Sequence, residues 1–123
     1  MGARILRILH RRARPMSAYA LLGELRRENP LNLYPQTIYR ALGDLIEKGF
    51  VHKLSSVNAF LACTHPRGTH EGIHLICDDC GMATELVDAR VDALLNRKAG
   101  ALAFKTQYRA VELHGVCGKC SQA

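Results

Sequence analysis

The chain has no run of about 18 apolar residues, the length that a membrane-spanning helix needs. It also has no apolar segment near its start followed by a cleavage motif of small residues, so nothing in it indicates export. We therefore expect a protein with no membrane partner. Together with cysteines spaced as metal ligands, these absences predict a protein of the reducing cytoplasm.

An excess of positive charge is lacking from the second half of the chain. Residues 63–123 hold 7 Lys and Arg against 7 Asp and Glu, whereas residues 1–62 hold 10 against 4, so the whole net charge of +6 lies in the first half. This asymmetry favours a nucleic-acid-binding part joined to a part that senses or assembles. A basic surface that only keeps the protein soluble is the alternative.

The first half has the pattern of three short helices. Apolar residues recur at helical spacing up to Pro15 and again from Ser17, a predicted N-cap, to about Glu28. A third helical pattern begins at Pro35, which suits a first turn, and ends at Gly49, which suits the position after a C-cap. Its predicted buried face comprises Ile38, Ala41, Leu42, Leu45 and Ile46.

A β-hairpin is predicted after the third helix, from residues 50–54 and 59–63 around a Ser-Ser-Val-Asn turn. Three helices followed by a hairpin make a winged helix-turn-helix, whose third helix enters the major groove of DNA. A polar helix face that merely contacts water is the alternative. The residues on the polar face at the start of this helix, which we expect to contact DNA, are Gln36, Thr37, Tyr39 and Arg40.

The second half is predicted to be a small α/β unit behind a linker at residues 64–69, which contain Pro and Gly. Strands are predicted at residues 73–77, 82–87 and 104–113, with a helix at residues 88–100 that its first residue, an aspartate, would cap. A sheet of this size cannot bury both of its faces. We therefore expect a homodimer.

Two Cys-x-x-Cys pairs, Cys77 with Cys80 and Cys117 with Cys120, offer four thiolates. Two intervening residues allow a tight turn that directs both sulfurs of a pair at one tetrahedral ion, which is typical of a structural zinc site. Disulfides or a redox-active pair are the alternatives, and two such pairs without an export signal favour zinc over both. The pairs lie farther apart than the ~15 to 20 residues of a local zinc ribbon, so the ion would connect elements distant in sequence.

Further candidate ligands fall where the two halves meet. Each alone is more typical of a surface histidine, a buried thiol or a solvated carboxylate. Together, two imidazoles, one thiolate and one carboxylate suit zinc better than a hard or ferrous ion. An ion held by both halves would set the angle between them and so act as a switch. These four residues are His52, Cys63, His70 and Glu85.

An enzyme is the rival hypothesis, because His70-Glu71-Gly72-Ile73-His74 matches the His-Glu-x-x-His pattern of zinc proteases. That chemistry needs both histidines on one face of a helix, with the glutamate beside the metal-bound water. Here the pattern contains a glycine and runs into a predicted strand, where positions four apart are about 13 Å from each other. We therefore expect no protease activity, and no enzyme.

The order of helices, the runs at residues 37–42 (Thr-Ile-Tyr-Arg-Ala-Leu) and 49–53 (Gly-Phe-Val-His-Lys), and the paired cysteines resemble the ferric uptake regulator family. The mixed set of ligands at the junction is similar to that of its zinc uptake regulators. The resemblance implies an α+β fold: a winged-helix DNA-binding domain at residues 1–63, a hinge linker at 64–69, and an α/β dimerisation and metal-binding domain at 70–123.

The resemblance further implies a repressor of metal-uptake genes that zinc activates and that binds AT-rich palindromic operators. It assigns two zinc ions to each chain, a structural one at the four cysteines and a regulatory one at the junction. Tyr19 and Arg40 match positions that the family uses on DNA, and His74 and His114 match positions that could form a weak third site. An iron or peroxide sensor is the alternative within the family, with Cys63 the feature against it.

Overall fold

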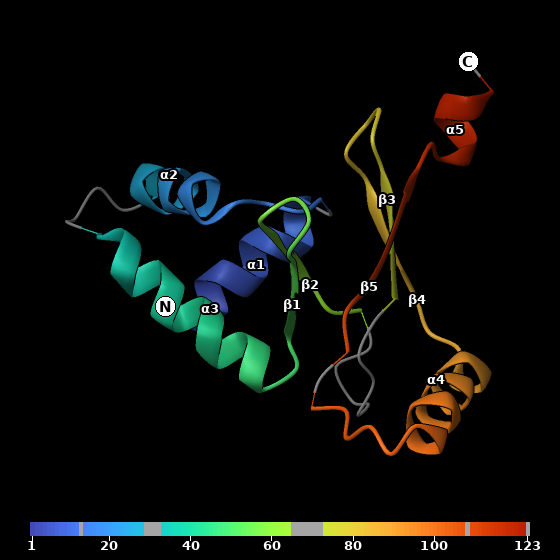
Figure 1. Ribbon diagram of the computed structural model, residues 1–123. Helices are drawn as coiled ribbons and strands as arrows, with labels where there is room; N and C mark the ends of the chain where they lie inside the picture. The colour runs from blue at the N-terminus through green and yellow to red at the C-terminus, as the bar shows by residue number, and fades with distance from the viewer. Residues whose placement is uncertain (13, 29–32, 65–72, 108, 123) are drawn as a thin grey trace.

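The computed structural model describes residues 1–12, 14–28, 33–64, 73–107 and 109–122. Its elements lie in two groups, side by side in Figure 1. The first comprises α1 (Gly2–Arg12), α2 (Ala18–Glu28), α3 (Pro35–Glu47), β1 (Val51–Leu54) and β2 (Ala59–Ala62). The second comprises β3 (Ile73–Cys77), β4 (Ala83–Leu86), α4 (Ala89–Ala101), β5 (Val111–Gly115) and the short α5 (Gly118–Ser121). The predicted α+β class, with three helices and a hairpin before a smaller α/β unit, is confirmed.

The apolar stripes of the three N-terminal helices meet in one core, which the hairpin closes. Ile46, predicted to belong to this core, is instead 38% exposed. It lies about 80° around α3 from Ile38, at the margin of the stripe, because eight residues make a little more than two turns. The largest buried side chains of the core are Ile5, Ile8, Leu9, Leu21, Leu25, Ile38, Leu42 and Val51.

Side chains cap two of the helices as predicted. Ser17 Oγ accepts a hydrogen bond from the Ala20 amide at 3.1 Å at the start of α2. Asp88 accepts one from the Arg90 amide at 2.9 Å at the start of α4. Each cap satisfies an amide that has no partner within its helix, so these two boundaries were readable from local sequence.

Helix α3 ends in a hydrogen-bonded turn around Gly49. The Gly49 amide donates to the Ile46 carbonyl at 3.0 Å, and the Phe50 amide donates to the Leu45 carbonyl at 2.9 Å. This pair of bonds is a Schellman motif, which needs a left-handed residue, and Gly49 has φ +83°. The turn directs the chain out of α3 and into β1.

We expect Gly49→Ala to lower the free energy of unfolding by roughly 1 to 2 kcal/mol, the penalty of a side chain in the left-handed region. The backbone alone would cause this loss, since no other atom lies within 4 Å of the added Cβ. Gly43→Ala, in the middle of α3 and equally uncrowded, is the matched control and should raise stability by about 0.5 to 1 kcal/mol. Urea unfolding measures both variants. Equal shifts would contradict a backbone role for Gly49.

The three strands of the second group form one sheet in the order β4-β3-β5. Strand β4 runs antiparallel to β3, whereas β5 runs parallel to it and places Gly115 beside Cys77. The Asp78 amide extends this pairing by donating to the Gly115 carbonyl at 2.8 Å. Because parallel strands end at the same edge, the cysteine pairs at the ends of β3 and β5 meet there despite their separation in sequence.

The strand predicted for residues 104–113 is wrong over its first part and begins only at Val111. Helix α4 ends one residue later than predicted, in a turn where Ala103 has φ +54°. The Phe104 amide donates back to the Ala99 carbonyl at 2.9 Å, so Phe104 belongs to the helix end. No residue type indicates this turn, because an alanine stands where glycine is usual.

The predicted domain boundaries stay predictions. Of the predicted linker at residues 64–69, only Thr64 is described.

Candidate metal centres and DNA-binding surface

The sulfurs of Cys77, Cys80, Cys117 and Cys120 come together at the end of the sheet where β3 and β5 stop. All four Sγ atoms lie within 4.8 Å of one another, and those of Cys80 and Cys117 are 3.9 Å apart. Sulfurs at the corners of a tetrahedron, each ~2.3 Å from a zinc ion, would be about 3.8 Å apart. The cluster therefore has the dimensions of a four-thiolate zinc site.

The ionisation of these sulfurs also suits a cation. The amides of Cys117 and Cys80 donate to Cys77 Sγ at 3.3 and 3.4 Å, and they lower the pKa of Cys77 from 9.0 to about 6. Contact with the sulfurs of Cys117 and Cys77 raises the pKa of Cys120 to about 12. Four such sulfurs ionise together only beside a compensating cation. None of the five cysteines, all of which lie among the described residues, forms a disulfide, and the 3.9 Å between the sulfurs of Cys80 and Cys117 fits a shared ion better than an S–S bond.

A second cluster lies where the hairpin meets β4. His52 Nε2, from β1, lies 3.3 Å from Glu85 Oε1, and Cys63 Sγ, directly after β2, lies 3.7 Å from the same oxygen. One potential ligand atom from each residue falls within 4.8 Å of the others. The Glu85 side chain is only 2% exposed, and a carboxylate so buried needs a cation or hydrogen bonds. Imidazole, thiolate and carboxylate together fit zinc.

Thr64 holds Glu85 in position, a contact that sequence reasoning missed. Its amide and hydroxyl donate to Glu85 Oε2 at 3.2 and 3.0 Å, which leaves Oε1 beside His52 and Cys63. A hydrogen-bonded second oxygen fixes the direction of a ligating carboxylate. No sequence signal could have found this contact, since a threonine after a cysteine has no motif and its partner is 21 residues away.

The remaining histidines fall in different places. His70, the fourth predicted ligand of the junction, lies outside the described residues. His74 stands opposite Glu85 in the β3–β4 pairing, is 4% exposed, and has its ring centroid 4.8 Å from that of His52. His74 is therefore part of the surroundings of the junction cluster.

His114 contacts other partners, with Nδ1 lying 3.0 Å from Asp78 Oδ1 and Nε2 lying 2.8 Å from Ser56 Oγ. Within the described part of the chain, neither His74 nor His114 belongs to a group of three candidate ligands. The third metal site stays a prediction.

The side chains predicted to contact DNA are exposed on α2 and α3. Tyr19 is 70% exposed and Tyr39 is 47% exposed, which is unusual for residues with so much apolar surface. Tyr34, directly before α3, is 62% exposed and escaped the sequence prediction because it lies outside the helical pattern. The predicted set is Tyr19, Gln36, Thr37, Tyr39 and Arg40, all of them exposed.

The arginines of α1 form ion pairs with two glutamates of α2. Arg4, Arg7 and Arg11 lie 3.6, 3.1 and 3.7 Å from carboxylate oxygens of Glu28. Arg12 pairs with a second glutamate of α2, Glu24. Two carboxylates pair with four arginines here, and the net charge of +6 in the first half already counts both glutamates, so α1 retains part of its positive charge. Arg40 of α3 has no acidic partner among the described residues.

Residues 3–114 match the family described as the ferric uptake regulator family. The chain belongs to this family. The protease alternative is wrong, since the family consists of transcription regulators and the described end of the His-Glu-x-x-His pattern, Ile73 and His74, is strand β3. None of the described helices has the length and apolar character needed to cross a membrane.

Zinc uptake regulators are among its relatives. The zinc uptake regulation protein of Escherichia coli (strain K12) is 36% identical over 117 residues, which are 94% of this chain and 68% of that protein. The crystal structure of holo XcZur is 46% identical, with a TM-score of 0.88 over 99% of this chain and 84% of that one. The apo form of XcZur reaches only 0.50 at 44% identity over 98% of this chain and 82% of that one.

A zinc uptake regulator complexed with zinc and DNA is also similar in structure. It is 34% identical, with a TM-score of 0.92 over 98% of this chain and 81% of that chain. The prediction of a ferric uptake regulator fold, with a likeness to the zinc uptake regulators, is confirmed.

Proposed function

We propose that this protein is a DNA-binding repressor of metal-uptake genes for which zinc is the corepressor. One observation carries the proposal: the cluster of His52, Cys63 and Glu85 takes ligands from the hairpin and from β4, and so joins the two groups of elements. An ion bound there would favour one orientation of the winged helix. A ligand that prefers one of two orientations shifts the population toward it.

The comparisons support this reading of the junction. The two forms of XcZur are nearly equal in identity to this chain, yet the holo form is much closer in structure than the apo form. The arrangement described here also resembles a regulator bound to zinc and DNA. We therefore assign His52, Cys63, Glu85 and the undescribed His70 to a regulatory zinc, and the four cysteines to a structural zinc.

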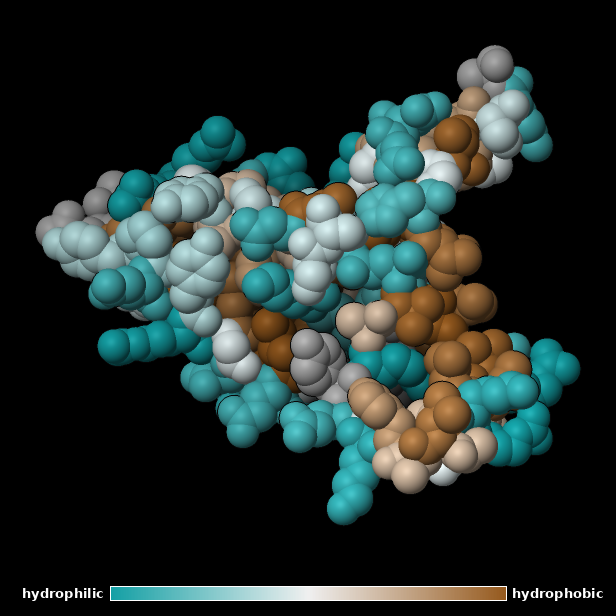
Figure 2. Space-filling model, in the orientation of Figure 1, coloured by the Kyte–Doolittle hydropathy of each residue, from teal (hydrophilic) through white to brown (hydrophobic). Residues whose placement is uncertain are grey.

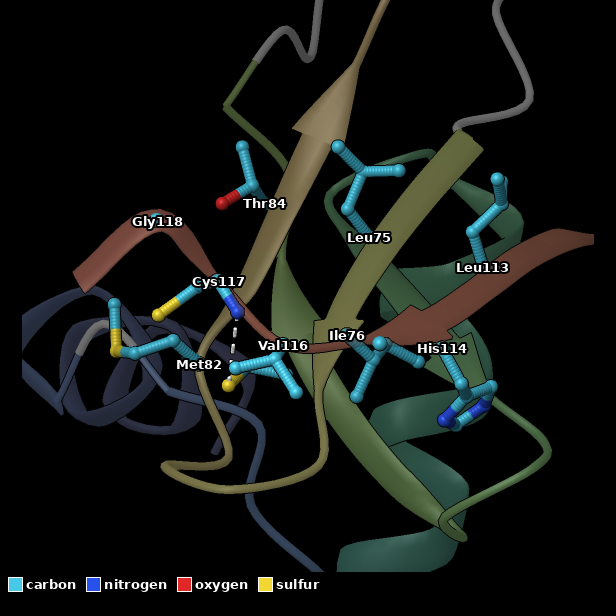
Figure 3. Close-up of a pocket in the computed structure, with 11 residues that line it drawn as sticks. Leu75, Ile76, Met82, Thr84, Leu113, His114, Val116, Cys117 and Gly118 are labelled. Atoms are coloured by element: carbon cyan, nitrogen blue, oxygen red, sulfur yellow. Dashed lines mark hydrogen bonds between the residues drawn. The ribbon is translucent and has the colours of Figure 1, made fainter. Parts of the chain in front are cut away.

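A homodimer accounts for the exposed apolar face of the second group. Figure 2 shows apolar side chains gathered over the sheet and α4. A hollow of about 440 Å³ lies on this face, between Leu75, Leu113 and Val116 and beside Cys117 (Figure 3). Among the described residues, α4 buries no side chain at all. A second copy of the chain covering this face would supply the core that the second group lacks, with residues 70–123 acting as the dimerisation domain.

Metal analysis with a zinc titration of operator binding tests the function. We expect one tightly held zinc and one exchangeable zinc per chain, and a tighter complex with an AT-rich palindromic duplex as the second site fills. The gain should fall within 5- to 150-fold, the usual range of coupling between two sites. A response to ferrous iron instead of zinc would favour the iron-sensing alternative. A single class of zinc site would exclude the switch.

The exposed arginine of α3 provides a test of the DNA surface. We expect Arg40→Ala to weaken operator binding about 5- to 150-fold if it pairs with a base. If it contacts a phosphate, the slope of log K against log salt should fall by roughly 0.9. Lys119→Ala, an equal loss of charge at an exposed residue of the second group, is the control and should bind normally. Zinc content and dimerisation should stay unchanged in both. Normal binding by Arg40→Ala at physiological salt would exclude α3 as the recognition helix.

A further inference from the structure

The turn of the hairpin, residues 55–58, contacts the sheet of the second group at a point distinct from the junction cluster. Ser56 Oγ donates to Glu112 Oε1 at 2.7 Å, and the Ser56 amide approaches the same oxygen at 3.4 Å. Glu112 lies on β5, 56 residues further along the chain. The hairpin is therefore held at both ends, at Cys63 beside Glu85 and at Ser56 beside Glu112.

The same serine connects the turn to the first cysteine pair. His114, two residues after Glu112 on β5, has Nε2 at 2.8 Å from Ser56 Oγ and Nδ1 at 3.0 Å from Asp78 Oδ1. Asp78 belongs to the turn between Cys77 and Cys80. A histidine ring with both nitrogens in hydrogen bonds is fixed in direction, so it transmits the position of the cysteine turn to the hairpin.

A second contact reaches that cysteine turn from the N-terminal group. Arg14, between α1 and α2, donates from a guanidinium nitrogen to the Cys80 carbonyl at 2.9 Å, across 66 residues of sequence. The first group of elements, which we call the winged-helix group, thus contacts the turn from Cys77 to Cys80 twice. It does so directly at Cys80 and through His114 at Asp78.

We propose that Ser56, Glu112, His114 and Asp78 form a latch that holds the winged-helix group in its DNA-binding orientation. The proposal rests on the proposed function, because operator affinity is the property that depends on this orientation. Two separate points of attachment are needed to define the angle between two bodies, and a junction ion alone is one point. The latch supplies a second point of attachment. Through Asp78, it also links the structural cysteine site to the orientation of the first group.

The latch is strong enough to bias the orientation and too weak to lock it. Its side chains are partly in water, with His114 35% and Asp78 60% exposed, and an exposed hydrogen bond gives a modest net gain because water competes for both partners. We expect Ser56→Ala to reduce two affinities, each by about 2- to 10-fold. Because coupling is reciprocal, these are the affinity for the exchangeable zinc without DNA and the affinity for the operator at saturating zinc.

The experiment compares Ser56→Ala with Ser55→Ala in the chain of 123 residues. Ser55 neighbours Ser56 in the same exposed turn, and its side chain forms none of the hydrogen bonds found between the hairpin and the sheet among the described residues. Three quantities are measured: the radius of gyration without DNA, the affinity of the exchangeable zinc without DNA, and operator affinity at saturating zinc. For Ser56→Ala we expect a larger radius of gyration and both affinities reduced about 2- to 10-fold. Ser55→Ala should match the parent.

A cycle with Glu112→Ala completes the test, because alanine removes the acceptor that glutamine would keep. Ser56→Ala and Glu112→Ala remove the same bond between hydroxyl and carboxylate, so the double variant should lose little more operator affinity than the larger single loss. Weaker operator binding with unchanged zinc affinity, unchanged scattering and additive losses would overturn the latch, because it would make Ser56 an ordinary DNA contact. A parent protein that ignores zinc would count against the proposed function alone. In that case unchanged scattering of Ser56→Ala would still overturn the latch.

Discussion

Replacing Cys117 by serine is expected to unfold the second half of the chain and abolish the dimer. Cys117 begins the second cysteine pair, and its amide donates to Cys77 Sγ at 3.3 Å, so it supports the cluster with both its sulfur and its backbone. A closed four-thiolate site contributes its metal-binding free energy to folding, on the order of 10 kcal/mol or more. Among the described residues, α4 buries no side chain that would offset this loss.

Sedimentation velocity, circular dichroism and zinc content measure the effect. Cys117→Ser should sediment as a monomer, lose helix and strand signal from the second half, and contain no tightly held zinc. Lys119→Ala, between the cysteines of the same pair, is the control and should remain a folded dimer with its zinc. A folded dimer of Cys117→Ser that still holds two zinc ions would contradict the structural assignment of the cluster.

Replacing Cys63 by serine is expected to preserve the folded dimer, unlike Cys117→Ser, but to abolish its response to zinc. Cys63 is 2% exposed and lies 3.7 Å from Glu85 Oε1, within the candidate regulatory cluster. Serine nearly preserves its volume but removes the thiolate, the soft ligand that favours zinc. The gain in operator affinity on adding zinc, 5- to 150-fold in the parent by the usual range of coupling, should disappear.

A zinc titration of operator binding, with sedimentation to report the dimer, measures this variant. Thr64→Val is a graded control, since it removes the hydroxyl that bonds Glu85 Oε2 at 3.0 Å but leaves every candidate ligand in place. A change in the surroundings of a ligand typically costs about 10- to 100-fold in metal affinity. Thr64→Val should therefore need a higher zinc concentration for half of its response, and at saturating zinc it should bind the operator as tightly as the parent. If Cys63→Ser is monomeric, or if it responds normally to zinc, the regulatory assignment fails and Cys63 is only a buried thiol.

Much of the fold was predictable because its signals are local. The spacing of apolar residues in α1, α2 and α3, the caps at Ser17 and Asp88, and Gly49 after α3 each act within one or two helical turns. The turn after α4, which replaces the first part of the predicted strand, was not predictable for the same reason: its left-handed residue is Ala103, and the local signal that glycine usually provides is missing.

The candidate metal residues were also recognisable as residue types at suggestive spacings. Sequence could propose that the two cysteine pairs share one ion, but only the parallel pairing of β3 with β5 brings them within 4.8 Å of one another. Likewise, His52, Cys63 and Glu85 stood out as candidates, whereas the two bonds from Thr64 that orient Glu85 did not.

The sequence by itself determined the helices, the hairpin, the four-cysteine set and the family, because capping, periodicity and ligand spacing depend on neighbours in the chain. Only the tertiary structure decided which way Glu85 points, that the arginines of α1 pair with glutamates of α2, and that Ser56 reaches Glu112 and His114. These contacts join residues between 12 and 58 positions apart. Their geometry depends on how strands and helices pack, and no local pattern of residues encodes that.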